Sequence, residues 1–226
     1  MANYTKGTET KDAILRSARE LFYTGGYLDT HNKDIAEHAG VNVGLIHYYY
    51  RTKGAIALEI YIDFLLAQLE LVREKFPEEE LTVRNAIAFR LLWGAMSRDA
   101  ALLRFLREIG TEHIPLQLAD SSVGQRYMGA MNEGGERQSE ELQIICRCSI
   151  AAEMELIEHF ASENCTMSAE SLAEMDERLT LQMASVPEKE ITRVLQRSGE
   201  CAEPFRMDMS APLKPCLCRN ETNPKE

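Results

Sequence analysis

The chain has 226 residues, of which 45% are hydrophobic and 27% are charged, and its formal net charge is -11. This length and composition are those of an ordinary globular protein, so a miniprotein that depends on disulfides or metals is excluded. Met1 is followed by polar residues, and no apolar run approaches the roughly 18 to 20 residues that cross a bilayer. We therefore expect a soluble, cytoplasmic protein that has no membrane partner.

The acidity of the chain is unevenly distributed, which bears on whether it can bind nucleic acid. Residues 1–53 carry seven Lys and Arg against six Asp and Glu, whereas residues 54–226 carry 18 against 30. Polyanion binding depends on cations that neutralise phosphates. The charge distribution therefore permits DNA binding by the N-terminal segment, with weaker non-specific affinity than a strongly basic domain would have.

Apolar residues recur at intervals of three and four along nearly the whole chain, and no two-residue alternation is convincing. This periodicity predicts an all-α protein. Between residues 110 and 135 the pattern loosens, and four of the seven prolines fall in the last 23 residues, which predicts an irregular or disordered tail over 201–226. The expected helices cover residues 10–23, 32–39, a short segment directly after Gly40, 53–76, 81–96, 100–109, 139–161, 168–184 and 188–197.

The most informative stretch covers residues 34–53, where two short helices are expected to flank a tight turn. Gly40 can adopt the left-handed conformation that ends a helix, and Ala36 and Ala39 are small enough for two helices to cross closely. This arrangement of residue types indicates a helix-turn-helix unit. Without further support, a glycine between two short helices is more often a simple αα-corner.

The second helix of this unit has a well-defined start and an outer face that needs explaining. Asn42 is a competent N-cap, and Val41 and Ile46 occupy the positions of a hydrophobic staple. Ile46 and Tyr50 share the inward face. The residues left near the helix start or on outer faces are Val43, Gly44, Leu45, His47, Tyr48 and Tyr49.

A helix that lies in the major groove of DNA accounts for this outer face. Gly44 permits close approach to phosphates, the apolar residues beside it can contact thymine methyl groups, and His47 can hydrogen-bond a base edge. The neighbouring tyrosines and Lys53 suit phosphate contacts, although partial burial of a tyrosine and solvation of the lysine explain each residue singly. The candidate DNA-binding residues are Asn32, Lys33, Asn42, Val43, Gly44, Leu45, His47, Tyr48, Tyr49 and Lys53.

This segment resembles the DNA-binding domain of the TetR family of transcriptional regulators, over about residues 8–60. The family pattern is Ile-Ala-x-x-Ala-Gly-Val-Ser-x-Gly-x-Leu-Tyr-x-Tyr-Phe-x-x-Lys, in which Asn42, Ile46, His47 and Tyr50 replace Ser, Leu, Tyr and Phe. The positions that coincide with it are Ile35, Ala36, Ala39, Gly40, Val41, Gly44, Tyr49 and Lys53.

The chain departs from the family pattern at two informative positions. His31 stands where the family has the Ser or Thr that starts the second helix, although Thr30 could cap that helix by shifting one position. His47 replaces a tyrosine that often contacts DNA, which changes the hydrogen-bonding groups offered to an operator. The resemblance implies a helix-turn-helix domain over residues 1–53 and a helical ligand-binding and dimerisation domain over 54–200.

Two apolar seams at three-four spacing mark the expected second domain. One interpretation is an intramolecular core; the family resemblance instead places two such helices from each subunit in a four-helix dimer interface. A two-fold dimer would also set two recognition helices about 34 Å apart, as successive major grooves require. The seam residues are Leu142, Ile145, Ser149, Ala152, Leu156 and Phe160 in one helix and Leu172, Met175, Leu179 and Met183 in the other.

The helices between residues 81 and 109 combine aromatic residues with arginines, a mixture that can line an apolar pocket with a few polar groups. For any one of these residues core packing is the simpler explanation. We expect a small-molecule effector on the grounds of the family resemblance. The candidate pocket residues are Phe89, Trp93, Met96, Arg104 and Phe105.

The six cysteines follow no zinc-finger spacing, and the sequence contains no phosphate loop, nucleophile elbow or metalloprotease helix. We therefore expect no enzyme activity, no cofactor and no metal. A thiol- or metal-responsive regulator that uses Cys201, Cys216 and Cys218 remains an alternative, as does a helical adaptor that binds a protein partner. The leading hypothesis is a homodimeric repressor that binds a palindromic DNA operator and is released by a small molecule.

Overall fold

The structure is a computed structural model that describes residues 2–122, 124–131 and 140–220, with side chains from residue 7 onward. Within these ranges the chain forms ten α-helices, one short 3-10 helix and one β-hairpin. None of the described helices is long and apolar enough to cross a membrane. The elements are α1 (Ala2–Gly25), α2 (Asn32–Ala39), α3 (Val43–Tyr50), α4 (Lys53–Lys75), α5 (Leu81–Met96), α6 (Ala100–Thr111), η1 (Pro115–Gln117), α7 (Gly124–Met131), α8 (Glu140–Phe160), α9 (Ala169–Met183), α10 (Glu188–Ala202), β1 (Phe205–Ala211) and β2 (Lys214–Arg219).

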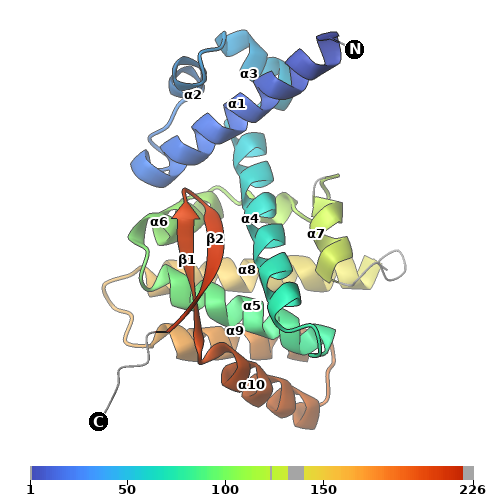
Figure 1. The fold of residues 1–226 in the computed structure, drawn as a ribbon. Helices are drawn as coiled ribbons and strands as arrows, with labels where there is room; N and C mark the ends of the chain where they lie inside the picture. Colours follow the sequence, from blue (N-terminus) through green and yellow to red (C-terminus); the bar gives the residue numbers. More distant parts are fainter. Residues whose placement is uncertain (1, 123, 132–139, 221–226) are drawn as a thin grey trace.

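The first three helices form a small unit at one end of the molecule, and α4 leads from it into the larger helical domain (Figure 1). In α1 the apolar side chains Ile14, Ala18 and Phe22 recur at four-residue spacing and are completely buried. Ile35 of α2 and Ile46 of α3 are buried with them. The N-terminal unit therefore has its own apolar centre, which is continuous with the core around α4.

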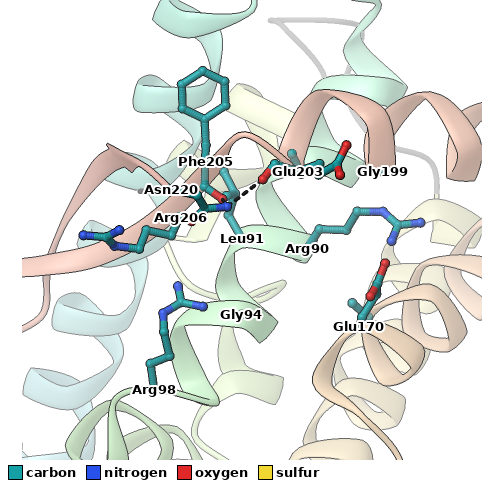
Figure 2. A pocket seen from close by; sticks show the side chains of 12 residues that line it. Arg90, Leu91, Gly94, Arg98, Glu170, Gly199, Glu203, Phe205, Arg206 and Asn220 are labelled. Atoms are coloured by element: carbon teal, nitrogen blue, oxygen red, sulfur yellow. Dashed lines mark hydrogen bonds between the residues drawn. The ribbon is translucent and has the colours of Figure 1, made fainter. Parts of the chain in front are cut away.

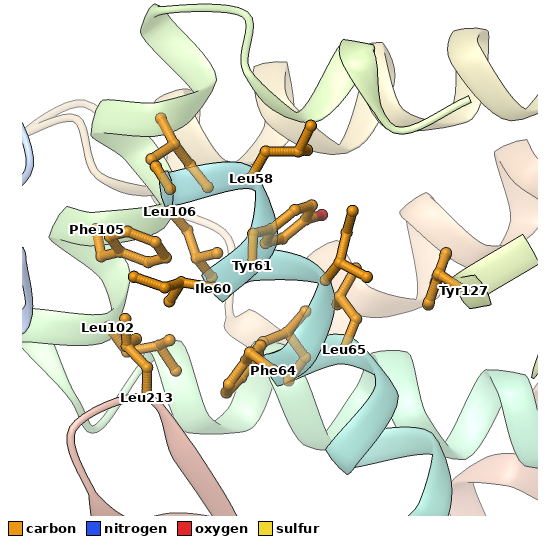
Figure 3. Close-up of a cluster of buried hydrophobic side chains, with 14 of the residues drawn as sticks. Leu58, Ile60, Tyr61, Phe64, Leu65, Leu102, Phe105, Leu106, Tyr127 and Leu213 are labelled. Atoms are coloured by element: carbon orange, nitrogen blue, oxygen red, sulfur yellow. The ribbon is translucent and has the colours of Figure 1, made fainter. Parts of the chain in front are cut away.

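The core of the larger domain is built around α4. Ile60 and Phe64 are buried, and Figure 3 shows Ile60 directed at Phe105 of α6. Leu213, from the turn of the hairpin, closes the same cluster. A helix that is apolar on most sides, as α4 is, must be covered on most sides. Here α1, α5, α7 and the hairpin contact α4, and Figure 3 shows side chains of α6 beside it.

The predicted helical fold is confirmed, and most helix boundaries agree within a few residues. Helix α1 begins at Ala2 rather than at residue 10, since no proline interrupts the segment before it. Helix α7 lies where the sequence pattern loosens and was not predicted; Tyr127 and Met128 fix it by packing into the core.

The prediction of an irregular tail is wrong for residues 205–219, which form an antiparallel hairpin. Met207 and Leu213 are 2% and 1% exposed, so this hairpin belongs to the core. The sequence did contain a two-residue alternation, because Phe205, Met207 and Met209 pack against the core while the residues between them point away. The prolines argued against strands in this segment. Pro212, however, lies in the turn, and Pro215 lies in a strand that pairs on one side only, where a proline is tolerated. Residues 221–226 of the expected tail lie outside the described residues.

Candidate DNA-binding surface and ligand cavity

The turn between α2 and α3 has the geometry that the sequence predicts. Gly40 has φ 66° and ψ 32°, the left-handed conformation that a glycine adopts without strain. Asn42 then caps α3, because its Oδ1 accepts a hydrogen bond from the N–H of Gly44 at 2.8 Å. A side chain at position 44 would bring its Cβ to 3.2 Å from that same Oδ1. The turn therefore fixes the direction of α3 through local contacts alone.

The start of α2 is organised differently from the expectation. The backbone N–H of His31 donates to Oδ2 of Asp34 at 2.7 Å, so the acid three residues later secures this end of the helix. Thr30 does not cap α2: its hydroxyl is buried and donates to the carbonyl of Gly26 at 2.6 Å. The shifted-cap alternative is therefore wrong.

The outer face of α3 is exposed, and it carries side chains that a helix of a folded domain rarely leaves in water. Tyr48 is 77% exposed, Val43 is 42% exposed and Leu45 is 37% exposed. Ile46 and Tyr50 are buried, as the sequence predicts. The two short helices lie at the end of the molecule farthest from α10, with no other part of the larger domain over them (Figure 1).

His47 is exposed and its ring is oriented by the backbone. Its Nδ1 lies 3.3 Å from the carbonyl oxygen of Arg51. Because a carbonyl only accepts hydrogen bonds, a hydrogen bond here requires the proton of the neutral ring on Nδ1, and Nε2 is then an acceptor. Among base edges in the major groove, the amino groups of adenine and cytosine donate to such an acceptor.

The remaining expected contacts of α2 and α3 divide into exposed and internal residues. Lys33 is exposed, whereas Asn32 is half-buried, with an Oδ1 that has no hydrogen-bond partner among the described residues. Tyr49 is half-buried and its hydroxyl lies beside Gly7 of α1. Tyr48 packs edge-on against the ring of Tyr49, with 5.0 Å between ring centroids. Tyr48 is thus the more accessible of the two phenols.

Lys53 has an internal role that the sequence did not reveal. Its Nζ donates to the carbonyl oxygens of Tyr27 at 2.7 Å, Leu28 at 3.2 Å and Thr30 at 2.8 Å. The same ammonium lies 4.2 Å from the centroid of the Tyr27 ring. Its three protons are therefore used within the domain, and burial lowers the pKa of the amine. The structure gives this lysine the role of tying the α1–α2 connection to α4, rather than of contacting phosphate.

Some other cations of the N-terminal domain also have internal partners, and others are exposed. Lys11 pairs with Glu59 at 2.8 Å and Arg19 with Asp63 at 3.4 Å, so both join α1 to α4. Arg51, which follows α3 directly, is exposed on the same part of the surface as the end of that helix. Sequence reasoning missed it as a candidate phosphate contact, although its position next to the recognition helix was a usable signal.

The expected pocket residues are mostly core. Trp93, Met96 and Phe105 are at most 1% exposed, and Phe105 stacks on Phe22 of α1. Arg104 donates to the carbonyl oxygens of two residues at the end of α1, at 2.7 and 3.0 Å. Of the five predicted residues, only Phe89 lines the cavity described next. The aromatic residues of α5 and α6 therefore serve mainly core packing, and Arg104 joins the helical domain to the N-terminal domain.

A cavity of about 170 Å³ lies among α4, α5, α7, α8 and α9. Apolar and aromatic side chains form most of its wall, and two buried carboxyl groups, those of Glu153 and Asp176, also line it. A largely apolar cavity with a few convergent polar groups is the common form of a small-molecule site. The apolar and aromatic lining residues are Tyr61, Leu65, Phe89, Leu118, Tyr127, Met128, Met131, Leu142, Ile145 and Ile150.

The seam predicted along α8 faces inward over much of its length. Leu142, Ile145 and Ser149 line the cavity, and Phe160 packs edge-on against Trp93 with 5.8 Å between ring centroids. Ala152 and Leu156 are partly buried. Most of these residues therefore serve the intramolecular core, which was the other interpretation of the pattern, whereas Leu142 lines the cavity and is also 46% exposed.

The seam predicted along α9 is divided between its two faces. Leu172 is fully buried and Met183 is partly buried. Met175 and Leu179 are 39% and 37% exposed, and Ile144 of α8 is 55% exposed. The apolar surface that these two helices leave exposed therefore includes Leu142, Met175 and Leu179 from the predicted seams, together with Ile144, which was not predicted.

A second cavity, of about 240 Å³, lies between α5, α9, α10 and the hairpin (Figure 2). Its arginines are engaged with protein groups. Arg90 donates to Oγ of Ser198 and to the carbonyl of Leu195, both at 2.9 Å, and Arg98 donates to the carbonyl of Met207 at 3.3 Å. We interpret these arginines as the groups that fasten α10 and the hairpin to α5.

The C-terminal cysteines do not form a metal centre in the part of the chain that is described, where no group of three or more potential ligands converges. Cys216 and Cys218 share one face of β2 opposite Asp208, and all six cysteines are free thiols. Cys201 lies apart on α10, where its Sγ contacts Glu79.

Two short helices joined by a tight turn, with the second exposing one face at the tip of the molecule, define a helix-turn-helix DNA-binding domain attached to a helical bundle. Residues 14–60 match the family described as bacterial regulatory proteins, tetR family. The match covers the helix-turn-helix and the first residues of α4, so the chain is similar to that family over this segment.

Two curated proteins and a solved structure are similar to the chain. It is 32% identical over 114 residues to the HTH-type transcriptional regulator AcrR of Shigella flexneri, which is 48% of this chain and 52% of AcrR. It is 40% identical over 55 residues to the probable HTH-type transcriptional regulator YttP of Bacillus subtilis, which is 24% of this chain and 27% of YttP. These matches therefore span about half of one relative and about a quarter of the other.

The solved structure is RolR in complex with the ligand resorcinol. It superposes with a TM-score of 0.57 at 17% identity, covering 86% of this chain and 96% of that one. At this identity the similarity shows the fold alone: the chain and RolR share an overall helical architecture.

Proposed function

We propose that this chain is a homodimeric transcriptional repressor that binds a palindromic operator with α3 and releases it when a small molecule occupies the cavity of the helical domain. The observation that carries the DNA-binding part is the outer face of α3. It exposes Val43, Leu45, His47 and Tyr48 at the tip of a domain whose family consists of bacterial regulatory proteins. These side chains combine apolar groups for thymine methyls with a hydrogen-bonding ring for a base edge.

The proposed protein contacts to phosphate come from the exposed cations and phenols around α3. We assign Lys33, Arg51 and Tyr48 to this role, since all three are exposed. Lys53 is omitted because its ammonium is held by backbone carbonyls. Asn42 and Gly44 are included for positioning, as the cap and the close-approach residue of α3.

Helices α8 and α9 pack against each other within the chain. The proposed dimer would use the faces of these two helices that point away from the core. Ile144, Met175 and Leu179 are large apolar side chains that remain well exposed there. Surfaces of this kind are typical of interfaces when several such residues lie together. A two-fold axis through this surface would supply the two recognition helices that a palindrome requires.

The proposed response to a ligand depends on the contacts that join the two domains. Helix α4 carries Tyr61 and Leu65 into the cavity wall and begins beside the helix-turn-helix. From α6, Arg104 holds the end of α1, and Glu108 accepts a hydrogen bond from the N–H of Leu28 at 2.9 Å. A ligand that displaces α4 relative to α6 would therefore change the position of the DNA-binding domain.

Fluorescence anisotropy with the DNA upstream of the gene tests this proposal. We expect salt-sensitive binding that requires an inverted repeat, and that is lost when Tyr48 and His47 are both replaced by alanine while the fold is retained. Equal affinity for scrambled DNA would refute sequence-specific regulation. It would favour a helical adaptor in which the helix-turn-helix is only a scaffold.

A further inference from the structure

The polar groups in the wall of the 170 Å³ cavity point to one class of ligand. Among the described residues that line it there is no Lys, Arg or His, whereas two carboxyl groups are present. One comes from Glu153 on α8 and the other from Asp176 on α9. The cavity therefore offers two carboxyl groups beside the hydroxyl groups of Ser149 and Thr180, and its described lining has no cation to receive an anionic ligand.

Glu153 is the group that the protein leaves unsatisfied. Its side chain is 5% exposed, and its Oε1 is buried without a hydrogen-bond partner among the described residues. A buried acceptor without a donor is costly, and such an atom in a cavity wall indicates where a ligand donor would bind. Asp176, which is 2% exposed, already accepts the indole N–H of Trp93 at 3.1 Å. Trp93 therefore orients one carboxyl group, while the other remains available.

The pKa values of the two carboxyl groups are raised, because both groups are buried and no positive charge faces them. Burial, together with the neighbouring Asp176, raises the pKa of Glu153 well above its usual range. Burial raises the pKa of Asp176 to about 6. The other titratable groups that face Glu153 are Tyr61 from α4, Tyr127 from α7 and Cys146 from its own helix, and burial raises the pKa of each of them too. None of these groups supplies a positive charge.

We propose that the ligand of this cavity is a small organic cation, a protonated amine or amidinium on an apolar body of about one ring, with its N–H groups directed at Glu153. This inference rests on the proposed ligand-responsive function and specifies its effector. The cation would satisfy Oε1 and stabilise the ionised form of Glu153 beside Asp176. The size limit follows from the volume, since an apolar cavity of about 150 Å³ holds benzene.

Binding also requires a defined transfer of a proton. Burial raises the pKa of Glu153 and so favours its protonated carboxyl group in the empty cavity. Binding of a cation would break the O–H bond of that group and release the proton to the buffer. The ammonium then faces a carboxylate. Calorimetry in two buffers of different ionisation enthalpy is expected to detect release of up to one proton for each ligand bound.

The experiment uses the full-length protein without DNA and three probes of matched shape: benzylamine, benzyl alcohol and benzoate. Trp93 is the sole tryptophan of the chain and its N–H is bonded to the cavity wall, so its fluorescence reports occupancy. We expect benzylamine to bind at least tenfold more tightly than benzyl alcohol, with benzoate the weakest. Equal binding of the amine and the alcohol, tightest binding of benzoate, or no binding of benzylamine at millimolar concentration would each overturn the proposal.

Variants locate the effect. Glu153→Gln preserves the shape of the side chain and is expected to reduce the preference for the amine below threefold, while benzyl alcohol binds as before. Glu155→Gln, at an exposed position of the same helix, is the matched control and should retain the full preference. Retention of the preference in Glu153→Gln would contradict the assignment, and the ranking of probes in the unmodified protein remains decisive if that variant does not fold.

This measurement is separable from the test of the proposed function because it contains no operator. Amine-selective binding in a protein that never releases DNA would refute ligand-controlled repression and leave the cavity assignment intact. Operator binding by a protein that shows no preference for the amine would refute the ligand class alone.

Discussion

Replacement of Lys53 by methionine tests the internal role of this residue in the N-terminal domain. The change keeps most of the aliphatic stem and removes an ammonium that donates to three carbonyl oxygens at 2.7, 3.2 and 2.8 Å and faces the ring of Tyr27 at 4.2 Å. A hydrogen bond from a charged donor contributes roughly 1.5 to 3 kcal/mol, and a cation–π contact about 0.5 to 2 kcal/mol. Water can reach some of these carbonyls after the change, so we expect a net loss of about 3 kcal/mol.

Urea unfolding measures this loss. The matched control is Lys33→Met, because Lys33 is an exposed lysine of α2, and such a change should alter the free energy of unfolding by less than about 0.5 kcal/mol. A loss below about 1 kcal/mol in Lys53→Met would show that the three carbonyl contacts contribute little, and the internal role would then be wrong.

Comparison of Lys53→Met with Arg51→Met distinguishes an internal lysine from a phosphate contact. Each phosphate contact adds about 0.9 to the slope of log K against log salt concentration. Lys53→Met should leave the slope unchanged at temperatures where the variant is folded. Arg51→Met should lower the magnitude of the slope by about 0.9, the value for one phosphate contact. A reduced slope in Lys53→Met would restore the phosphate role that the family pattern suggests.

Four further results are expected. Burial raises the pKa of Glu177 from 4.5 to about 7, so the folded state holds the proton of this carboxyl group more tightly than the unfolded state does. The stability that this proton confers is present below pH 4.5 and is lost as the pH rises to about 7. Relative to Glu177→Gln, the wild-type protein should therefore lose about 3 kcal/mol across that interval in urea titrations, and a constant difference would contradict the shift. Asn42→Ala removes the cap of α3 and should cost about 1 kcal/mol of stability by thermal unfolding, with no change meaning that the 2.8 Å bond to Gly44 is unimportant. His47→Ala should change the preferred base at one operator position by about 1 to 3 kcal/mol in competition binding, and a uniform loss across sequences would remove it from base readout. Leu179→Glu should shift the protein from dimer to monomer in light scattering, whereas an unchanged mass would exclude this face of α9 from the interface.

Local sequence patterns were sufficient for the helix-turn-helix. Gly40, Asn42 and Ile46 act on neighbours within a few residues, so their roles can be inferred without tertiary information. Several helix boundaries were predictable for the same reason: the helix expected over 168–184 is α9, which Ser168 caps. These are the parts of the fold in which geometry is set by short-range contacts.

Long-range contacts decided what the sequence could not. Lys53 finds its partners 23 to 26 residues away in the chain, and a family pattern gives no indication of whether such a lysine faces outward or inward. The α8 seam was recognised as apolar, but three-four spacing does not specify whether the opposing surface belongs to the same subunit. The pocket was misplaced because Trp93 and Phe105 are typical of both cores and cavities, and only packing shows that Glu153 and Asp176 share one space.

The proposed function requires that α3 reads DNA sequence in a two-fold arrangement. Footprinting of the full-length protein on the DNA upstream of its gene tests that claim most directly. We expect protection of an inverted repeat whose half-sites are centred about one helical turn, or a small whole number of turns, apart, with protection abolished by the Tyr48→Ala, His47→Ala double variant. Protection of a single unpaired site, or an unchanged footprint with the double variant, would contradict it.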